Sequence, residues 1–342
     1  MDWEAIRREA RSKFKGYCRV CKECNGRACA GEVPGMGGAG SGNSFIDNIE
    51  ALKEIKVNLR VIHGAKEPDT SIELFGQILQ LPVLAAPMTG ISYNMGGAVS
   101  EEEFIRSIVE GSIEAGTIAM TGDGADPAMY DSGVSAVKRA GGKGIPIIKP
   151  REQQEIFKYI SKAEEAGALA VGMDIDGAGL ITMALKGQPV GPKTPEELKE
   201  IISSTKLPFI VKGIMTPDEA ENAVKSGASA IVVSNHGGRI LDSMPGAARV
   251  LAEIVNAVGD EVIIFADGGV RSGVDVLKYL ALGADAVLVG RPLAVAVFGG
   301  GTEGVSFYLK KLKEELVQAM ILTGCASLRD VGPKIIFTKD SI

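Results

Sequence analysis

Short apolar runs recur along the chain, and before several of them stands a charged amphipathic segment that ends in glycine. Four of these joins are EAGTIAM, EAGALAVGMD, KSGASAIVVS and ALGADAVLVG. The glycine can adopt the left-handed conformation that ends a helix, and a run of Val, Ile and Ala is typical of a strand covered on both faces. The pattern therefore predicts repeated helix–strand units.

Eight runs have this strand character: LPVLAAPM, GTIAMTG, IPIIKP, ALAVGMD, PFIVKGI, AIVVSN, VIIFADGG and DAVLVGRP. Eight parallel strands alternating with helices predict an α/β fold, a (β/α)₈ TIM barrel over residues 81–292, with the helical run 304–324 completing the outer ring. A doubly wound open sheet is the alternative. The barrel is favoured because polar and glycine-rich residues follow nearly every strand, as expected if the strand ends meet at one mouth. Residues 1–80 are predicted to be an N-terminal extension and residues 81–342 the barrel domain.

The composition is that of an ordinary globular protein, with 45% hydrophobic and 23% charged residues. The formal charge of −6 is spread without long runs of one sign, so neither nucleic acid nor an anionic membrane is an expected partner. The first residues, MDWEAIRREARSKFKGY, lack the apolar core of a signal peptide, which predicts a cytoplasmic protein. The apolar run ADAVLVGRPLAVAVFGGG contains Asp285 and Arg291 and is too short to span a bilayer.

Glycines and arginines follow the last two predicted strands, in ADGGVRSG and VGRP. Paired glycines let backbone N–H groups approach an anion, and the loops after strands seven and eight are the usual phosphate site of this fold. Arg271 and Arg291 could add charge-assisted contacts. A simple turn is the alternative for each glycine pair, but the repetition at both strands favours a phosphate-bearing ligand.

Three ionisable residues end other predicted strands: Asp174 the fourth, Lys212 the fifth and His236 the sixth. A carboxylate beside an imidazole fixes its tautomer and stabilises its protonated form, which makes histidine a good general base. A lysine in an apolar cavity needs an anionic partner, and a cofactor that gains negative charge would supply one. The alternatives are a helix-capping Asp174 and a surface Lys212.

Beyond these general signals, the segments VKGIMTPDEA, VSNHGGRILD and FADGGVRSGVDVLKYLALGADAVLVGRP resemble the FMN-dependent 2-hydroxy-acid oxidase and dehydrogenase family, which includes glycolate oxidase, lactate oxidase and flavocytochrome b2. The resemblance is strong over residues 208–292, recognisable at LPVLAAPMTG, and present before the barrel at GGAGSGNSFIDNIEALKEI. It implies FMN as cofactor, a 2-hydroxy acid as substrate and an electron acceptor that the sequence does not identify. Related enzymes are often tetramers, so the resemblance is also compatible with a homo-oligomer.

The resemblance also implies roles for individual residues. His236 would remove the hydroxyl proton of the substrate, or its α-proton in the carbanion version, with Asp174 orienting it. Arg239 would bind the substrate carboxylate, and Lys212 would stabilise negative charge at the flavin N1–C2 carbonyl edge. The remaining flavin contacts would come from Pro87, Met88, Thr89, Gly122, Lys149, Ser234, Asp267, Gly268, Gly269, Arg271, Gly290 and Arg291.

The sequence departs from the family where substrate is held. By spacing, Pro34 and Ile148 stand where the family usually has tyrosines, and Ile181 stands in place of a second carboxylate-binding arginine. The flavin-contacting glutamine of strand three has no match, although Lys149 could reach the ring. Because Ile148 replaces a phenol and Ile181 replaces a guanidinium, the substrate pocket should be more apolar. This predicts a substrate bulkier or less polar than lactate or glycolate.

Cys18, Cys21, Cys24 and Cys29 form a cluster, CRVCKECNGRAC, that the family does not generally carry. Gaps of two and four residues are typical of metal ligands, and the spacing is close to that of the bacterial ferredoxin run. An iron–sulfur cluster and a zinc ion are both open, and a redox disulfide or unligated thiols are the alternatives.

The function predicted from these patterns is oxidation of a 2-hydroxy acid to a 2-oxo acid by an FMN enzyme, with hydride-like transfer to flavin N5. One alternative is a flavin-barrel isomerase without net oxidation, resembling type II isopentenyl diphosphate isomerase, although that family lacks SNHGGR. The other is a cofactor-binding protein without catalysis.

Overall fold

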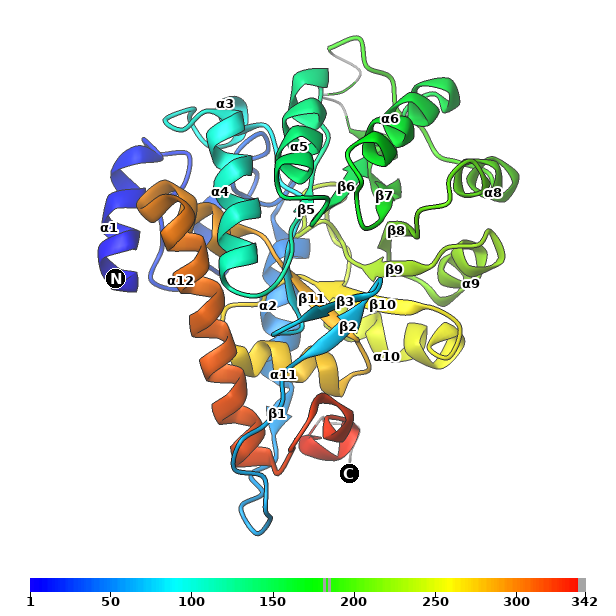
Figure 1. The fold of residues 1–342 in the computed structure, drawn as a ribbon. Helices are drawn as coiled ribbons and strands as arrows, with labels where there is room; N and C mark the ends of the chain where they lie inside the picture. The colour runs from blue at the N-terminus through cyan, green and yellow to red at the C-terminus, as the bar shows by residue number, and fades with distance from the viewer. Residues whose placement is uncertain (181–182, 184–185, 338–342) are drawn as a thin grey trace.

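A computed structural model describes residues 1–180, 183 and 186–337 of the chain (Figure 1). In this part of the chain, eight parallel strands form one sheet in the order β4-β11-β10-β9-β8-β7-β6-β5, and a bridge between Ala85 and Ala119 joins its two edges. The predicted barrel is therefore confirmed. Its strands are β4 (Val83–Ala85), β5 (Met120–Thr121), β6 (Ile145–Ile148), β7 (Val171–Asp174), β8 (Phe209–Ile214), β9 (Ala230–Val233), β10 (Ile263–Asp267) and β11 (Ala286–Val289).

Helices surround these strands (Figure 1). Several begin at residues that the sequence marks as caps: Thr194 before α8 and Ser272 before α11 each form a capping box, which satisfies backbone N–H groups of the first turn. The helices that follow the first barrel strand, β4, are α3 (Ile91–Asn94), α4 (Glu101–Glu114), α5 (Pro127–Arg139), α6 (Gln153–Glu165), α8 (Pro195–Ser203), α9 (Pro217–Lys225), α10 (Ala247–Val258), α11 (Gly273–Ala281) and α12 (Arg291–Thr323).

Helix α12 completes the ring, as the sequence predicted, by packing between α4 and α11. It consists of two helical segments separated by a kink at Gly301, which has a φ of 57° and a non-helical backbone. The second half ends at Gly324, whose left-handed conformation closes the helix as the glycine pattern predicts. Short 3₁₀ turns η3 (Leu328–Asp330) and η4 (Pro333–Ile335) follow.

The barrel interior is filled by apolar side chains, and a hairpin closes one end of it. The inward cluster includes Leu84, Ile147, Ile210 and Phe265, which are buried. The hairpin of β2 (Ile72–Leu74) and β3 (Gln77–Leu79) adds Leu74 and Leu79 to the same cluster. Because the interior is packed, a ligand cannot lie within the barrel, and the carboxyl ends of the strands are the expected place for one.

The N-terminal extension packs on the barrel. Helix α1 (Trp3–Lys13) lies along α12, and α2 (Asn43–Glu54) contacts α10. Strand β1 (Lys56–Val57) pairs antiparallel with β12 (Ile336–Phe337), near the other end of the described chain. The 3₁₀ turn η1 (Arg27–Cys29) stands between α1 and α2. A division at residue 80 stays a prediction, because the extension and the barrel share one hydrophobic cluster.

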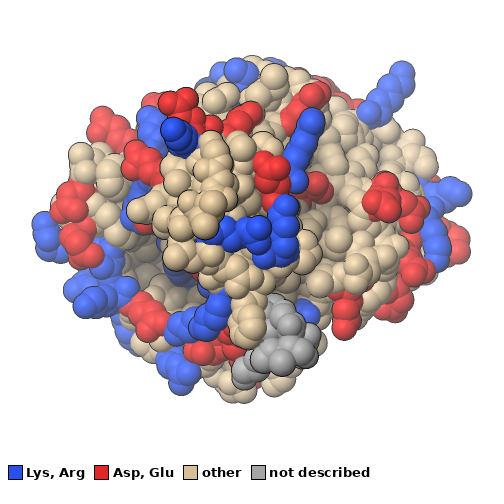
Figure 2. Space-filling view, turned by 90° about the horizontal axis from the view of Figure 1, so that it is seen from below, with Lys and Arg blue, Asp and Glu red and all other residues tan. Residues whose placement is uncertain are grey.

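The molecular surface carries charges of both signs. On the face shown in Figure 2, basic and acidic side chains are interspersed among uncharged ones. None of the helices in the described ranges has the length and hydropathy that a membrane crossing requires.

Candidate active site

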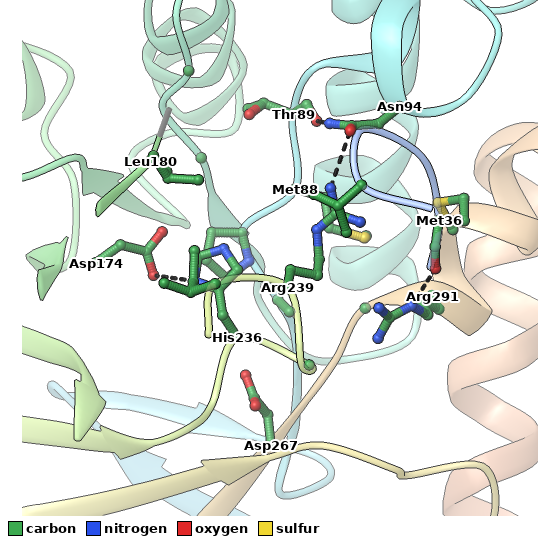
Figure 3. A pocket seen from close by; sticks show the side chains of 18 of the residues that line it. Met36, Met88, Thr89, Asn94, Asp174, Leu180, His236, Arg239, Asp267 and Arg291 are labelled. Carbon is green, nitrogen blue, oxygen red and sulfur yellow. Dashed lines mark hydrogen bonds and ion pairs between the residues drawn. The ribbon is translucent and has the colours of Figure 1, made fainter. Parts of the chain in front are cut away.

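A cavity of about 500 Å³ lies at the carboxyl ends of the barrel strands. Residues that follow β4, β5, β9, β10 and β11 line it, together with side chains from the ends of β6, β7 and β8. The loop 33–40 of the N-terminal extension closes part of its wall. Figure 3 shows His236, Arg239, Asp174, Asp267 and Arg291 converging on this cavity. The site therefore combines the barrel mouth with a segment that precedes the barrel.

His236 is held by an unusual turn after β9. The residues His236, Gly237 and Gly238 have φ values of 58°, 64° and 76°, so three successive residues are left-handed. A Cβ at Gly238 would lie 2.3 Å from the backbone nitrogen of Phe45, so only glycine fits there. The His236 N–H donates to Ser234 Oγ at 3.0 Å, which anchors the turn to the end of β9.

The carboxylate that is hydrogen-bonded to this imidazole is not Asp174, the predicted one. His236 Nδ1 lies 3.0 Å from Asp176 Oδ2 and 3.9 Å from Asp174 Oδ1. The hydrogen bond that we expected from Asp174 is thus made by Asp176, in the 3₁₀ turn η2 (Ile175–Gly179). The physical reason is that both oxygens of the Asp174 carboxylate already form ion pairs, one with Lys149 and one with Lys212.

Asp174, Lys149 and Lys212 form a buried ionic cluster. Lys149 Nζ lies 2.7 Å from Asp174 Oδ2, and Lys212 Nζ lies 2.9 Å from Asp174 Oδ1. Burial on its own would raise the pKa of Asp174, but the two ammonium groups hold it well below its usual range. Burial would lower the pKa of Lys212, yet Asp174 raises it above its usual range. The Asp174 carboxylate and the Lys212 ammonium are therefore both charged, and the cluster holds two lysines for one carboxylate.

Arg239 is a largely buried cation without an anionic partner in the part of the chain that the structure describes. Its Nη2 donates to Asn94 Oδ1 at 3.0 Å and its Nη1 donates to the carbonyl of Gly35. No carboxylate of the described residues lies within ion-pair distance of Arg239. Burial lowers the pKa of Arg239, which expresses the cost of desolvating an unpaired guanidinium. An anionic ligand in the cavity would offset that cost.

A second group of cations stands beside the glycine loops after β10 and β11. Arg291 donates to the carbonyls of Met36 and Gly37, both at 2.8 Å, and lies over the Phe45 ring. Burial, with the nearby Arg239, lowers the pKa of Arg291 to about 9. The Nε of Arg271 is buried and has no hydrogen-bond partner among the residues that the structure describes. Polar groups left unpaired in this way fit a phosphate.

The glycine loop after β10 also has a packing role. A Cβ at Gly268 would lie 2.4 Å from Asn48 Oδ1 in α2, and Gly268 has a φ of 101°. Asn48 Nδ2 in turn donates to Asn235 Oδ1 at 2.8 Å, which ties α2 to the turn that carries His236. Glycine is thus needed both by the backbone conformation and by the close approach of the extension.

Most of the residues predicted to contact flavin line the cavity. Ser234 does not line it: this residue is fully buried, and its hydroxyl donates to Asp267 Oδ1 at 2.7 Å. Of the positions that replace family residues, Pro34 lines the cavity, Ile148 is buried without lining it, and Ile181 lies outside the described residues. The predicted residues that line it are Pro87, Met88, Thr89, Gly122, Lys149, Asp174, Lys212, His236, Arg239, Asp267, Gly268, Gly269, Arg271, Gly290 and Arg291.

Sequence reasoning missed several residues that line the cavity or contact its lining. Asp176 carried a signal, since the alternation in MDID places it two residues beyond Asp174. Asp123 and Arg151 form a buried ion pair at 2.8 Å, and Asp123 also accepts the Lys149 backbone N–H. Tyr93 lines the cavity, but nothing in its sequence context marked it.

Comparison with known proteins identifies the family. The family model described as FMN-dependent dehydrogenase matches residues 35–183 and 182–338. The chain belongs to the FMN-dependent dehydrogenase family. Among curated relatives, a 2-hydroxyacid oxidase of Dictyostelium discoideum is 32% identical, over 87% of this chain and 83% of the relative. Glycolate oxidase 1 of Oryza sativa subsp. indica is 31% identical, over 85% and 87% of the two chains.

Solved structures agree with this assignment. The crystal structure of a mandelate oxidase with (S)-2-phenylpropionate is 30% identical, covers 98% of each chain and has a TM-score of 0.79. As a member of the FMN-dependent dehydrogenase family, the protein is an FMN-dependent oxidoreductase of 2-hydroxy acids, and the isomerase alternative is not favoured. The cavity fits FMN, because its glycine loops suit a phosphate together with Arg271 and Arg291, which have no carboxylate partner among the described residues, and its buried lysines suit an anionic ring.

Proposed function

We propose that this enzyme oxidises 2-hydroxy acids whose side chains are larger or less polar than those of glycolate and lactate, with His236 as the base. The proposal rests on the positions of His236 and Arg239 in one cavity. The His236 imidazole, backed by Asp176, faces the same cavity as Arg239, which has no carboxylate partner among the described residues. A base beside an unpaired cation suits a molecule that has a hydroxyl group next to a carboxylate.

Each residue has a distinct task in this proposal. Arg239 binds the substrate carboxylate and so sets the hydroxyl group against the imidazole. The hydrogen bond from Nδ1 to Asp176 leaves Nε2 of His236 as the proton acceptor, and the Asp176 carboxylate stabilises the imidazolium that results. Arg271, Arg291 and the glycines after β10 and β11 would hold FMN, which would supply the hydride-accepting chemistry when bound. Lys149 and Lys212, which share one carboxylate, favour negative charge in the cavity.

The proposed substrate class rests on the apolar part of the wall. Apolar side chains from the N-terminal loop, from the segment after β7 and from the turn after β9 line the same cavity as His236 and Arg239. They are Val33, Pro34, Met36, Leu180, Met183 and Ile240. An extended or aromatic substrate side chain would bury its surface against them at about 25 cal/mol per Å² of apolar area.

A panel of 2-hydroxy acids tests this proposal. We expect anaerobic flavin bleaching to be at least about tenfold faster, as kcat/KM, with mandelate or a long-chain 2-hydroxy acid than with glycolate, because about 1.4 kcal/mol of apolar contact gives a factor of ten. Stopped-flow absorbance at the flavin band gives the rates. Equal rates across the panel would refute the substrate class, whereas no bleaching with any member would refute oxidation of 2-hydroxy acids by this site.

The two aspartates should respond differently to removal of their charge. We expect Asp176→Asn to lower kcat about 10- to 100-fold, because the imidazolium loses its partner, while thermal stability changes little. Asp174→Asn leaves two buried ammonium groups without a carboxylate, so it should lower the unfolding free energy by about 3 kcal/mol or more. Steady-state kinetics and thermal denaturation of both variants measure the contrast. A larger loss of kcat in a stable Asp174→Asn than in Asp176→Asn would return the orienting role to Asp174.

A further inference from the structure

A second cavity, of about 360 Å³, lies next to the candidate active site. The segment 18–29, the start of α1 and the first turns of α12 surround it, and all four clustered cysteines line it: Cys18, Cys21, Cys24 and Cys29. Arg271 and Arg291 line both cavities, so they form part of the partition between them. On this measure a single water molecule needs about 10–15 Å³, so the second cavity is many times that size. That is far more space than one metal ion needs.

The sulfur atoms surround this space and do not converge on one point. All five cysteines of the chain are free thiols. Among the described residues, the one group of three or more ligand atoms within 4.8 Å of one another belongs to Asp174, Asp176 and His236, so no three cysteine sulfurs are that close. A zinc ion bonds its sulfur ligands at about 2.3 Å, which draws the four together. An iron–sulfur cube binds each thiolate through a different iron atom and therefore holds its ligands farther apart.

The wall of this cavity is arranged for negative charge. Arg271 Nη2 donates to the Cys24 carbonyl at 3.2 Å and to Cys24 Sγ at 3.4 Å, while its buried Nε has no partner in the described part of the chain. Arg291 has no ion pair with a carboxylate of the described residues. A four-iron cluster with four thiolate ligands carries about two negative charges in its oxidised form, so these two guanidinium groups would offset the cost of burying it.

The backbone of the segment adds donors and order. The Val20 N–H donates to Cys18 Sγ at 3.4 Å, a contact of the kind that tunes cluster sulfurs. Arg7 in α1 donates to the carbonyls of Val20 and Cys21, at 3.3 Å and 2.9 Å, and Arg11 Nη2 donates to the Val20 carbonyl at 2.8 Å. Helix α1 thus holds the cysteine segment in place, although the segment has little regular structure of its own.

We propose that Cys18, Cys21, Cys24 and Cys29 bind an iron–sulfur cluster of the four-iron, four-sulfide type, beside the arginine-lined end of the flavin cavity. The order of gaps, two, two and four residues, differs by one residue from the bacterial ferredoxin run. The proposal goes beyond hydroxy-acid oxidation and does not depend on the substrate, so the substrate panel and the experiment below can fail separately.

Metal and sulfide content test the proposal directly. The full-length holoenzyme is purified without air and incubated with ferrous iron, sulfide and a thiol reductant, with zinc added in a parallel sample. We expect about four iron and about four sulfide per chain, broad absorption beyond the flavin bands, and an electron paramagnetic resonance signal after reduction with dithionite. Zinc at one per chain with no iron retained, disulfide formation among the four cysteines, or no metal in either sample would overturn the proposal.

Serine variants locate the ligands. Cys21→Ser and Cys24→Ser should each lose most of the iron, whereas Cys325→Ser should retain it. Cys325 is the matched control because it is buried after α12, where its sulfur contacts the Asp330 carbonyl and does not line the cavity. Far-ultraviolet circular dichroism and thermal denaturation report whether each variant is folded, independently of its flavin content. Full iron content in a folded Cys24→Ser variant would contradict the assignment.

Discussion

Replacing His236 with asparagine should lower kcat/KM for a 2-hydroxy acid by about 10²- to 10⁴-fold, the range that a general base contributes. Asparagine can keep a hydrogen bond to Asp176 from the same turn but cannot accept the hydroxyl proton. FMN content should stay at the wild-type level, because the arginines and glycines assigned to the phosphate are unchanged. Anaerobic flavin reduction by the best acid of the panel measures the effect.

His63→Asn is the matched control, because His63 is the other histidine of the chain. Its side chain is exposed, and its Nε2 lies 2.9 Å from the Arg60 carbonyl, away from the cavity. This variant should reduce flavin at the wild-type rate. A His236→Asn enzyme that retains FMN and also reduces it within threefold of wild type would remove His236 from the role of base.

Replacing Arg239 with methionine should lower kcat/KM by about 100-fold, because a charge-assisted contact to the substrate carboxylate is worth about 3 kcal/mol. Most of the loss should appear in KM, since the carboxylate is bound both before and during the reaction. The variant also removes a desolvated, unpaired cation, so its thermal stability should not fall by much. Steady-state kinetics and thermal denaturation give the two quantities.

A double-mutant cycle separates substrate binding from indirect damage. The wild type and Arg239→Met are each compared on a 2-hydroxy acid and on its methyl ester, which has no negative charge. If Arg239 binds the carboxylate, the variant should lose about 100-fold on the acid and little on the ester. Equal losses on both substrates would mean that Arg239 does not bind the carboxylate and acts instead by holding the cavity wall through its hydrogen bonds to Asn94 and Gly35.

The fold could be predicted because its signals are local. Each buried parallel strand is a short apolar run, and glycines such as Gly167, Gly227 and Gly283 mark the helix ends before three of them with φ values of 68°, 100° and 104°. How the extension would pack could not be predicted in the same way. The pairing of β1 with β12 joins segments about 280 residues apart, and such pairs leave no periodic trace in either segment.

The sequence predicted which residues lie at the site better than it predicted which of them contact one another. The position of His236 at the barrel mouth followed from its place after a predicted strand. The choice between Asp174 and Asp176 depended on Lys149 and Lys212, which come from two other strands and take the first carboxylate. Ser234 likewise turned away from the cavity to hold Asp267. Competition among side chains for one partner is decided in three dimensions, so residue order alone does not reveal it.

Because Arg271 and Arg291 line both cavities, a charged ligand in one cavity is expected to change the affinity of the other cavity for its own ligand. One continuous stretch of chain, residues 18–40, supplies the cysteines on one side and the Val33–Gly40 wall on the other, so a ligand that orders the stretch from either side lowers the entropy cost for the other. Such linkage is reciprocal: if metal binding raises the affinity for FMN by some factor, FMN binding raises the affinity for the metal by the same factor. If ordering of this stretch favours both ligands, removal of the proposed cluster should weaken FMN binding.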